Sequence, residues 1–333
     1  MTGKFLETYY FFVMASRLIL GCWMVFLCFA CNSTENVTPL TPTKPYVLGK
    51  NRFTVKVDAD DREYYTHIPK GYDGKTAFPV VIMCHGTGGD GEKFYNISGW
   101  KELGETQNIL TIFPSSWEYC VTEVGIKKTT TKWNIYPSTF TYCPGETPRD
   151  DIKFMRIMME DLKQKYNVDA KRIYFVGFSN GGEFTSRCAV ELSDLLAACV
   201  ANAGPLPPNA NYTPKRLLPV MLQFGNSDEL IKLAIGTKSD FPMDFNQLFS
   251  TYPAIQQLVN SYLNSFKVKT TYTAKGDANN YIWADYPSIA GNTDNWFRLV
   301  LVKGLDHNYP NGINHPLKGA ELHWGWIKDY KLP

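Results

Sequence analysis

The stretch Arg172–Gly182, RIYFVGFSNGG, decides the fold class of this chain. Its first five residues form an apolar, β-rich run that predicts a buried strand, and a helix is predicted from Asn180 onward. Between them, GFSNG at 177–181 matches the pattern Gly-x-Ser-x-Gly. In this strand-to-helix setting, the pattern predicts a tight turn that lifts the hydroxyl of Ser179 clear of the sheet. A plain glycine-rich turn with Ser179 as an N-cap is the alternative interpretation.

Strand-like and helix-like segments alternate on both sides of this stretch. A hairpin is predicted over 53–57 and 63–68, with further strands at 79–84, 109–113, 197–203, 219–224 and 298–302. Helices are predicted at about 93–106, 150–166, 230–265 and 317–329. The region 114–148 has no clean periodicity and is predicted to be a long irregular loop. The alternation predicts one α/β domain over 49–333, with a mostly parallel sheet covered by helices on both faces.

Composition excludes several classes of protein. Of the 333 residues, 44% are apolar and 20% are charged, which is an ordinary globular mix rather than that of a disordered chain, a coiled coil or a polytopic membrane protein. The net charge of +2 gives no electrostatic reason to bind nucleic acid. No spacing of Cys and His resembles a zinc site, so we predict neither a metal nor a cofactor. The sequence does not indicate an oligomeric state.

The N-terminal segment resembles an export signal. Arg17 precedes the apolar run LILGCWMVFLCFAC at 18–31, which is shorter than a membrane-spanning helix. We therefore predict a signal peptide over 1–30, with Met14 as an alternative start, and a flexible Ser-, Thr- and Pro-rich tether over 31–48. Cys31 follows Ala30 as in a bacterial lipobox and is a candidate for lipidation. A plain cleaved signal and an uncleaved anchor remain the alternatives.

These features predict an exported protein that is extracellular, periplasmic or an outer-surface lipoprotein, with a membrane contact only through the lipid anchor. Export makes disulfides possible. Cys120 and Cys143 flank a polar, aromatic loop and are the predicted pair. Cys84 and Cys199 lie in apolar, strand-like runs and are predicted to be buried thiols.

A serine nucleophile needs a base, and only five histidines are available. His307 follows the last predicted strand after a short loop, where such a base is expected. His315, just before the closing helix, is the second candidate. The other three lie in the predicted hairpin, in a glycine-rich loop and in the last helix.

The base needs a carboxylate that fixes its tautomer. Asp228 directly follows the predicted strand 219–224 and lies between Ser179 and His307 in chain order. Glu229 is the neighbouring alternative, and Asp306 is a weaker one.

A serine site of this kind also needs N–H donors for an oxyanion. The sequence HGTGG at 85–89 follows the strand 79–84, where a second donor loop belongs. The backbone N–H groups of Thr87 and Asn180 are the candidate donors.

Several segments together resemble the α/β-hydrolases. More narrowly, they resemble the secreted esterase group that includes polyhydroxybutyrate depolymerases and the feruloyl and acetylxylan esterases of carbohydrate esterase family one. The resembling stretches are YTHIP (65–69), PVVIMCHGTGG (79–89), DDIKFM (150–155), RIYFVGFSNGG (172–182), PVMLQFGNSD (219–228) and GLDHNYPNG (304–312). In that group, Gly-x-x-His-x-(Trp/Tyr)-Pro carries the catalytic histidine, which favours His307 over His315.

The resemblance implies a serine carboxylic ester hydrolase. With the predicted export and an aromatic-rich loop, it favours feruloyl or acetyl esters on plant polysaccharide as substrates, although the loop's aromatic residues could equally serve packing. Trp133, Phe178 and Tyr309 are the predicted substrate contacts. Polyhydroxybutyrate depolymerase, a serine peptidase of the prolyl-oligopeptidase type, and a non-catalytic binding module remain as alternatives.

Overall fold

The computed structural model describes residues 46–123, 125–136, 140–291 and 295–333. The predicted signal peptide, Cys31 and most of the predicted tether lie outside these residues. At the start of the described chain, Tyr46 packs edge-on against Tyr72, with ring centroids 4.8 Å apart. The first strand begins at Gly49. No helix in the described ranges is both long and apolar enough to cross a membrane.

Parallel strands form the centre of the main sheet, as the alternating pattern predicted. In spatial order they are β4 (Leu110–Pro114), β3 (Phe78–Cys84), β8 (Val168–Phe178), β9 (Ala198–Asn202), β10 (Val220–Gly225) and β13 (Trp296–Val302). Most of their residues are buried, because a parallel sheet is covered on both faces. This explains why these strands appear in the sequence as continuous apolar runs.

An antiparallel hairpin extends the sheet at each edge. The predicted N-terminal hairpin is β1 (Gly49–Val57) and β2 (Asp60–Ile68), and β2 pairs antiparallel with β4. At the other edge lie β12 (Tyr281–Pro287) and β11 (Thr273–Asp277), which the sequence analysis did not predict.

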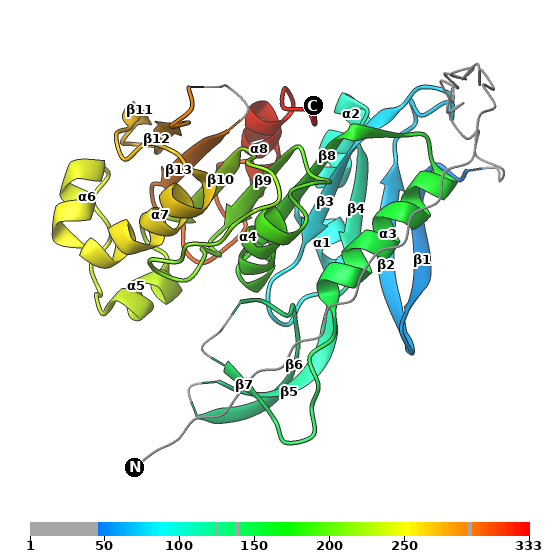
Figure 1. The fold of residues 1–333 in the computed structure, drawn as a ribbon, viewed down its shortest axis with the longest axis horizontal. Helices are drawn as coiled ribbons and strands as arrows, with labels where there is room; N and C mark the ends of the chain where they lie inside the picture. Colours follow the sequence, from blue (N-terminus) through cyan, green and yellow to red (C-terminus); the bar gives the residue numbers. More distant parts are fainter. Residues whose placement is uncertain (1–45, 124, 137–139, 292–294) are drawn as a thin grey trace, which may run out of the picture. The chain divides into compact units, whose positions relative to one another are not determined.

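Helices cover both faces of the sheet (Figure 1). Two apolar layers lie between these helices and the sheet. Along β3, Val80 and Ile82 face one layer, whereas Val81 and Met83 face the other. The first layer is completed by α3 (Asp151–Lys165), α4 (Asn180–Glu191), α5 (Glu229–Ile235), α6 (Phe245–Thr251) and α7 (Pro253–Phe266). The second is completed by α1 (Gly91–Ile97), α2 (Trp100–Gln107) and α8 (Gly319–Ile327).

Two predicted helices are broken in the structure. The segment 93–106 forms α1 and α2, separated at Gly99, whose φ of 78° lies outside the helical range. The segment 230–265 forms α5, α6 and α7: Gly236 ends α5 with a φ of 81°, and Pro253 begins α7. Glycine with positive φ commonly ends a helix, and proline suits its first position.

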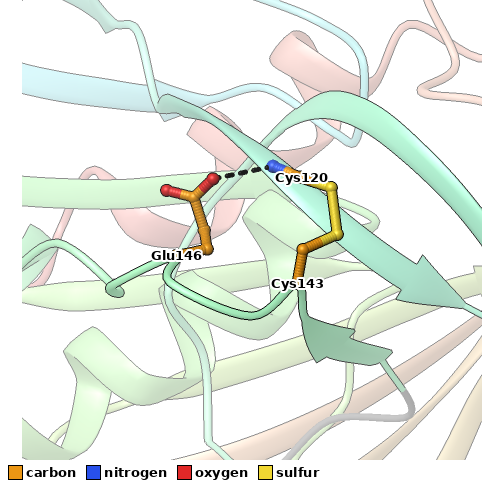
Figure 2. Close-up of a disulfide and its surroundings, with 3 residues drawn as sticks. All are labelled: Cys120, Cys143 and Glu146. Atoms are coloured by element: carbon orange, nitrogen blue, oxygen red, sulfur yellow. Dashed lines mark hydrogen bonds between the residues drawn. A yellow bond between two sulfur atoms is a disulfide. The ribbon is translucent and has the colours of Figure 1, made fainter.

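The region predicted to be irregular, 114–148, contains a small antiparallel sheet. It consists of β5 (Trp117–Glu123), β6 (Ile126–Lys132) and β7 (Phe140–Tyr142), with β5 in the middle. A disulfide joins Cys120 and Cys143, the pair predicted from the sequence, and Glu146 accepts a hydrogen bond from the Cys120 N–H at 3.0 Å (Figure 2). Cys84, Cys188 and Cys199 are buried free thiols.

Candidate active site

Ser179 occupies the sharp turn between β8 and α4. Its backbone has φ 53° and ψ −125°, a conformation that is costly for a residue with a side chain. The turn is held from both sides: the Ser179 N–H donates to the Asn202 carbonyl at 2.8 Å, and the Ser179 carbonyl accepts from the Glu183 N–H at 2.9 Å. The predicted strand–turn–helix geometry around the serine is therefore present.

The structure brings the three predicted side chains into one hydrogen-bonded chain. The hydroxyl of Ser179 lies 2.8 Å from Nε2 of His307. Nδ1 of His307 lies 2.9 Å and 3.0 Å from the two carboxylate oxygens of Asp228. With Nδ1 protonated and donating to Asp228, Nε2 is free to accept the proton of Ser179.

Asp228 is held rigidly at the start of α5. Its side chain is fully buried, and Oδ1 accepts hydrogen bonds from the backbone N–H groups of Leu230 at 3.1 Å and Ile231 at 3.0 Å. These N–H groups belong to the first turn of the helix, which favours negative charge. The carboxylate is therefore fixed as an acceptor facing the imidazole.

A network that the sequence analysis missed joins the loop of Asp228 to the loop of His307. The buried side chain of Asn226 accepts from the Gly304 N–H at 2.6 Å, and the Asn226 N–H donates to the Val302 carbonyl at 2.8 Å. A side-chain carbon on Gly225 would overlap the backbone of Leu305. Glycine followed by asparagine after a strand was the available signal, because together they allow two loops to approach closely.

The alternative candidates bond elsewhere. Nε2 of His315 faces the Lys303 carbonyl at 2.9 Å, and its Nδ1 accepts from the Leu317 N–H at 3.1 Å. The carboxylate of Glu229 accepts from the backbone N–H of His307 at 3.1 Å, whereas the ring nitrogens of His307 bond to Asp228 and Ser179. Asp306 is exposed, and its carboxylate has no hydrogen bond to His307 within the described ranges.

The predicted oxyanion loop lies against the serine. A side-chain carbon on Gly86 would lie 3.2 Å from the Cβ of Ser179, a tight contact that glycine avoids. Within the described part of the chain, the Thr87 N–H has no hydrogen-bond partner. The Asn180 N–H lies in the first turn of α4, where helical N–H groups have no partner within the helix. Both candidate donors are therefore available to an anion.

His85, at the start of this loop, has a structural role. Its Nδ1 donates to the Gly86 carbonyl at 2.7 Å, and its Nε2 accepts from the Ser116 N–H at 2.9 Å. Burial lowers the pKa of His85 to about 4, so the ring is neutral at pH 7.

Two of the three predicted substrate contacts are corrected by the structure. Trp133 is fully buried, and Tyr309 is 4% exposed with its hydroxyl bonded to Trp100 and His323, so neither presents a surface to a substrate. Phe178 is half-buried and lies beside His307, with ring centroids 5.1 Å apart. It remains a candidate contact.

The aromatic loop that favoured a binding platform is also largely packed. The ring of Tyr136 stacks on Tyr212 at 4.1 Å, and Arg149 lies 4.7 Å above the ring of Trp117. Across the described residues, no group of three His, Cys, Asp or Glu side chains is placed to hold a metal ion.

Comparison with known proteins identifies the family of the chain. Residues 72–251 match the phospholipase/carboxylesterase family. The chain belongs to this family of α/β-hydrolases. Feruloyl esterase B of Piromyces equi is 24% identical over 51% of this chain and 30% of its own length. Acetylxylan esterase A of Emericella nidulans is 25% identical over 42% of this chain and 41% of its own length.

A solved structure, the acetyl xylan esterase from Aspergillus awamori, has a TM-score of 0.52 at 14% identity. The matched region covers 84% of this chain and 99% of the Aspergillus awamori chain. At this identity, the likeness supports the fold alone. Matched regions span between 20% and 60% of the length of the curated relatives. The α/β-hydrolase fold and the relationship to feruloyl and acetylxylan esterases, both expected from the sequence, are confirmed.

Proposed function

We propose that this protein is a serine carboxylic ester hydrolase that works through a covalent acyl-enzyme. The observation that carries the proposal is the continuous chain from the Ser179 hydroxyl through His307 to buried Asp228, with every bond between 2.8 Å and 3.0 Å. A nucleophile, a base and an orienting carboxylate in hydrogen-bond contact are what acyl transfer requires. Membership of the phospholipase/carboxylesterase family supports the same reaction.

The mechanism follows from the positions of these groups. Nε2 of His307 takes the proton of Ser179 as the serine oxygen attacks the ester carbonyl carbon. Negative charge develops on the carbonyl oxygen, where the N–H groups of Thr87 and Asn180 would stabilise it. His307 then gives the proton to the leaving alcohol as the C–O bond breaks.

Deacylation repeats the same steps with water. His307 takes a proton from the water molecule that attacks the acyl carbon, and then returns a proton to the Ser179 oxygen when the acid leaves. Asp228 holds Nδ1 protonated and stabilises the imidazolium in both halves of the reaction.

The decisive experiment compares hydrolysis of p-nitrophenyl acetate by the wild-type chain and by Ser179→Ala. We expect turnover to fall at least about 1,000-fold, because only the oxyanion donors and substrate binding remain. Circular dichroism and thermal unfolding check that the variant is folded. Near-wild-type activity in a folded Ser179→Ala would refute the assignment and reopen the binding-module alternative.

For the substrate, we propose a feruloyl or acetyl ester on plant polysaccharide. Relatives named as a feruloyl esterase and an acetylxylan esterase support this class. A match to poly(3-hydroxyalkanoate) depolymerase C of Paucimonas lemoignei keeps hydroxyalkanoate esters as the second candidate. The test is kcat/KM on methyl ferulate, acetylated xylan and 3-hydroxybutyrate oligomers, with Ser179→Ala as the blank. A preference for the 3-hydroxybutyrate oligomers would overturn the polysaccharide proposal.

We also propose that the protein is exported, and that Cys31 anchors it through a lipid. The basic residue and apolar run at 17–31 support this, as does the Cys120–Cys143 disulfide, since disulfides persist in oxidising compartments. Radiolabelled palmitate should enter the wild type and Cys28→Ala, but not Cys31→Ala. Full-length, unlabelled protein in the reducing cytosol would contradict both parts of the proposal.

A further inference from the structure

Trp133 lies directly after β6, between the two segments that carry the proposed oxyanion donors. Its side chain is fully buried and stacks on Phe184 of α4, with ring centroids 4.8 Å apart and planes 6° from parallel. It also lies beside the ring of His85, at a centroid distance of 5.1 Å. The indole therefore fills the space between the glycine-rich loop and the helix that begins at Asn180.

Hydrogen bonds tie Trp133 to both segments. The indole N–H donates to the backbone carbonyl of His85 at 2.8 Å, two residues before Thr87. The backbone N–H of Trp133 donates to the side-chain oxygen of Asn180 at 2.7 Å. Since the backbone N–H groups of Thr87 and Asn180 are the proposed donors, one residue holds the segments of both.

Thr131, two residues earlier on β6, fastens the far end of the same loop. Its carbonyl accepts from the Gly88 N–H at 3.0 Å, and its hydroxyl donates to the Gly89 carbonyl at 2.6 Å. The bonds from Trp133 to His85 and from Thr131 to Gly88 and Gly89 thus fix the loop on both sides of Thr87. They restrict the orientation of the Thr87 N–H.

We propose that Trp133 is a positioning residue that sets the separation of the two oxyanion donors. Thr131 contributes by holding the same glycine-rich loop. The inference rests on the proposed acyl transfer and adds a positioning role for a residue that is fully buried. Donors act only when they lie about 2.7–3.1 Å from the developing oxyanion. A displaced donor therefore weakens binding of the transition state more than binding of the ester.

The test is Trp133→Phe, which removes the indole N–H but keeps an aromatic ring on Phe184. We expect kcat for p-nitrophenyl acetate to fall about 10- to 100-fold, with KM within about twofold. The rate of Ser179 phosphorylation by diethyl p-nitrophenyl phosphate should fall by a similar factor, because that reaction also develops charge at the oxyanion site.

Trp324→Phe is the matched control. Trp324 is also buried, and its indole N–H donates to Gln107 at 3.3 Å on the opposite layer of the molecule. Its variant also loses an indole hydrogen bond, but one that does not reach the oxyanion segments, so a drop in melting temperature with unchanged kcat is expected. Thr131→Val, which removes one hydroxyl at nearly constant volume, should lower kcat about 3- to 10-fold.

The outcomes separate this inference from the proposed function. If the wild type shows no Ser179-dependent hydrolysis, the proposed function fails. If the wild type is active and Trp133→Phe keeps its kcat and phosphorylation rate while losing only thermal stability, the positioning role is refuted. Should Trp133→Phe not fold, wild-type kcat in a folded Thr131→Val refutes it instead.

Discussion

Ser179 combines a reactive position with a strained backbone. Its φ of 53° and ψ of −125° lie where residues other than glycine pay about 1–3 kcal/mol. The strained conformation is held by the hydrogen bonds to Asn202 and Glu183. The hydroxyl is thereby held toward His307 before any substrate arrives.

This strain predicts an unusual order of stability. Ser179→Gly should be more stable than Ser179→Ala by about 1–3 kcal/mol, because glycine accepts this backbone conformation without strain and alanine does not. Urea unfolding of both inactive variants measures the difference. Equal stability would mean that the turn relaxes once the hydroxyl is gone.

The two neighbouring carboxylates after β10 should have very different effects. Asp228→Asn presents an amide to Nδ1 of His307 and favours the wrong tautomer, so kcat should fall about 1,000- to 10,000-fold. Glu229→Gln removes only a charge from the acceptor of the His307 N–H, and kcat should change less than about 10-fold. A harmless Asp228→Asn would transfer the orienting role to Glu229 or Asp306.

At the level of elements, continuous apolar runs were enough to predict the central strands, and three of them carry the site. Ser179, Asp228 and His307 follow β8, β10 and β13, and the carboxyl ends of parallel strands share one edge of the sheet. Their chain order and strand context therefore predicted the constellation. Trp133 and Asn226 were not recognised as supports, because their roles depend on contacts between loops far apart in sequence.

Elements with little apolar signal could not be predicted. β6 includes KKTTT at 127–131, and β11 is TAKGD, with every residue of β11 exposed. Neither shows the alternation of a half-buried strand. Backbone pairing with β5 and β12 forms these strands, and pairing partners are not visible in a single sequence.

The disulfide should stabilise the small sheet. It closes a loop with a sequence separation of 23 residues, for which loss of chain entropy in the unfolded state gives about 3 kcal/mol. Replacing Cys120 and Cys143 together by serine should lower the free energy of unfolding by roughly this amount. It should also speed hydrogen exchange in β5 and β6. Unchanged exchange and stability would show that pairing alone maintains the sheet.

Across the whole molecule, two buried imidazoles link stability to pH. Burial lowers the pKa of His85 to about 4 and that of His323 to about 3, whereas both ordinarily titrate near 6.5. From about pH 4 to 6.5 for His85, and from about pH 3 to 6.5 for His323, the unfolded chain binds more protons than the folded one. Acid therefore destabilises the fold. Each group contributes about 1.4 kcal/mol per pH unit within its window.

Stability should therefore rise as pH increases from about 4 to 6.5, and this contribution should level off above that range. In His323→Gln the slope of the unfolding free energy against pH should be shallower by about 1.4 kcal/mol per pH unit, which corresponds to one bound proton. Denaturant titrations at several pH values measure both slopes. The same slope in the two proteins would mean that His323 is not buried as a neutral ring.

The attachment of β6 to the glycine-rich loop has a consequence for altering this protein in the laboratory. Randomising 129–133 to change which ester is accepted would also disturb the bonds from Thr131 and Trp133. The rate of ester hydrolysis and the substrate selectivity would then change together, and most variants randomised at 129–133 would be inactive. Substitutions meant to change selectivity are better placed around Phe178. Its half-buried side chain lies beside His307 and makes no hydrogen bond to the glycine-rich loop.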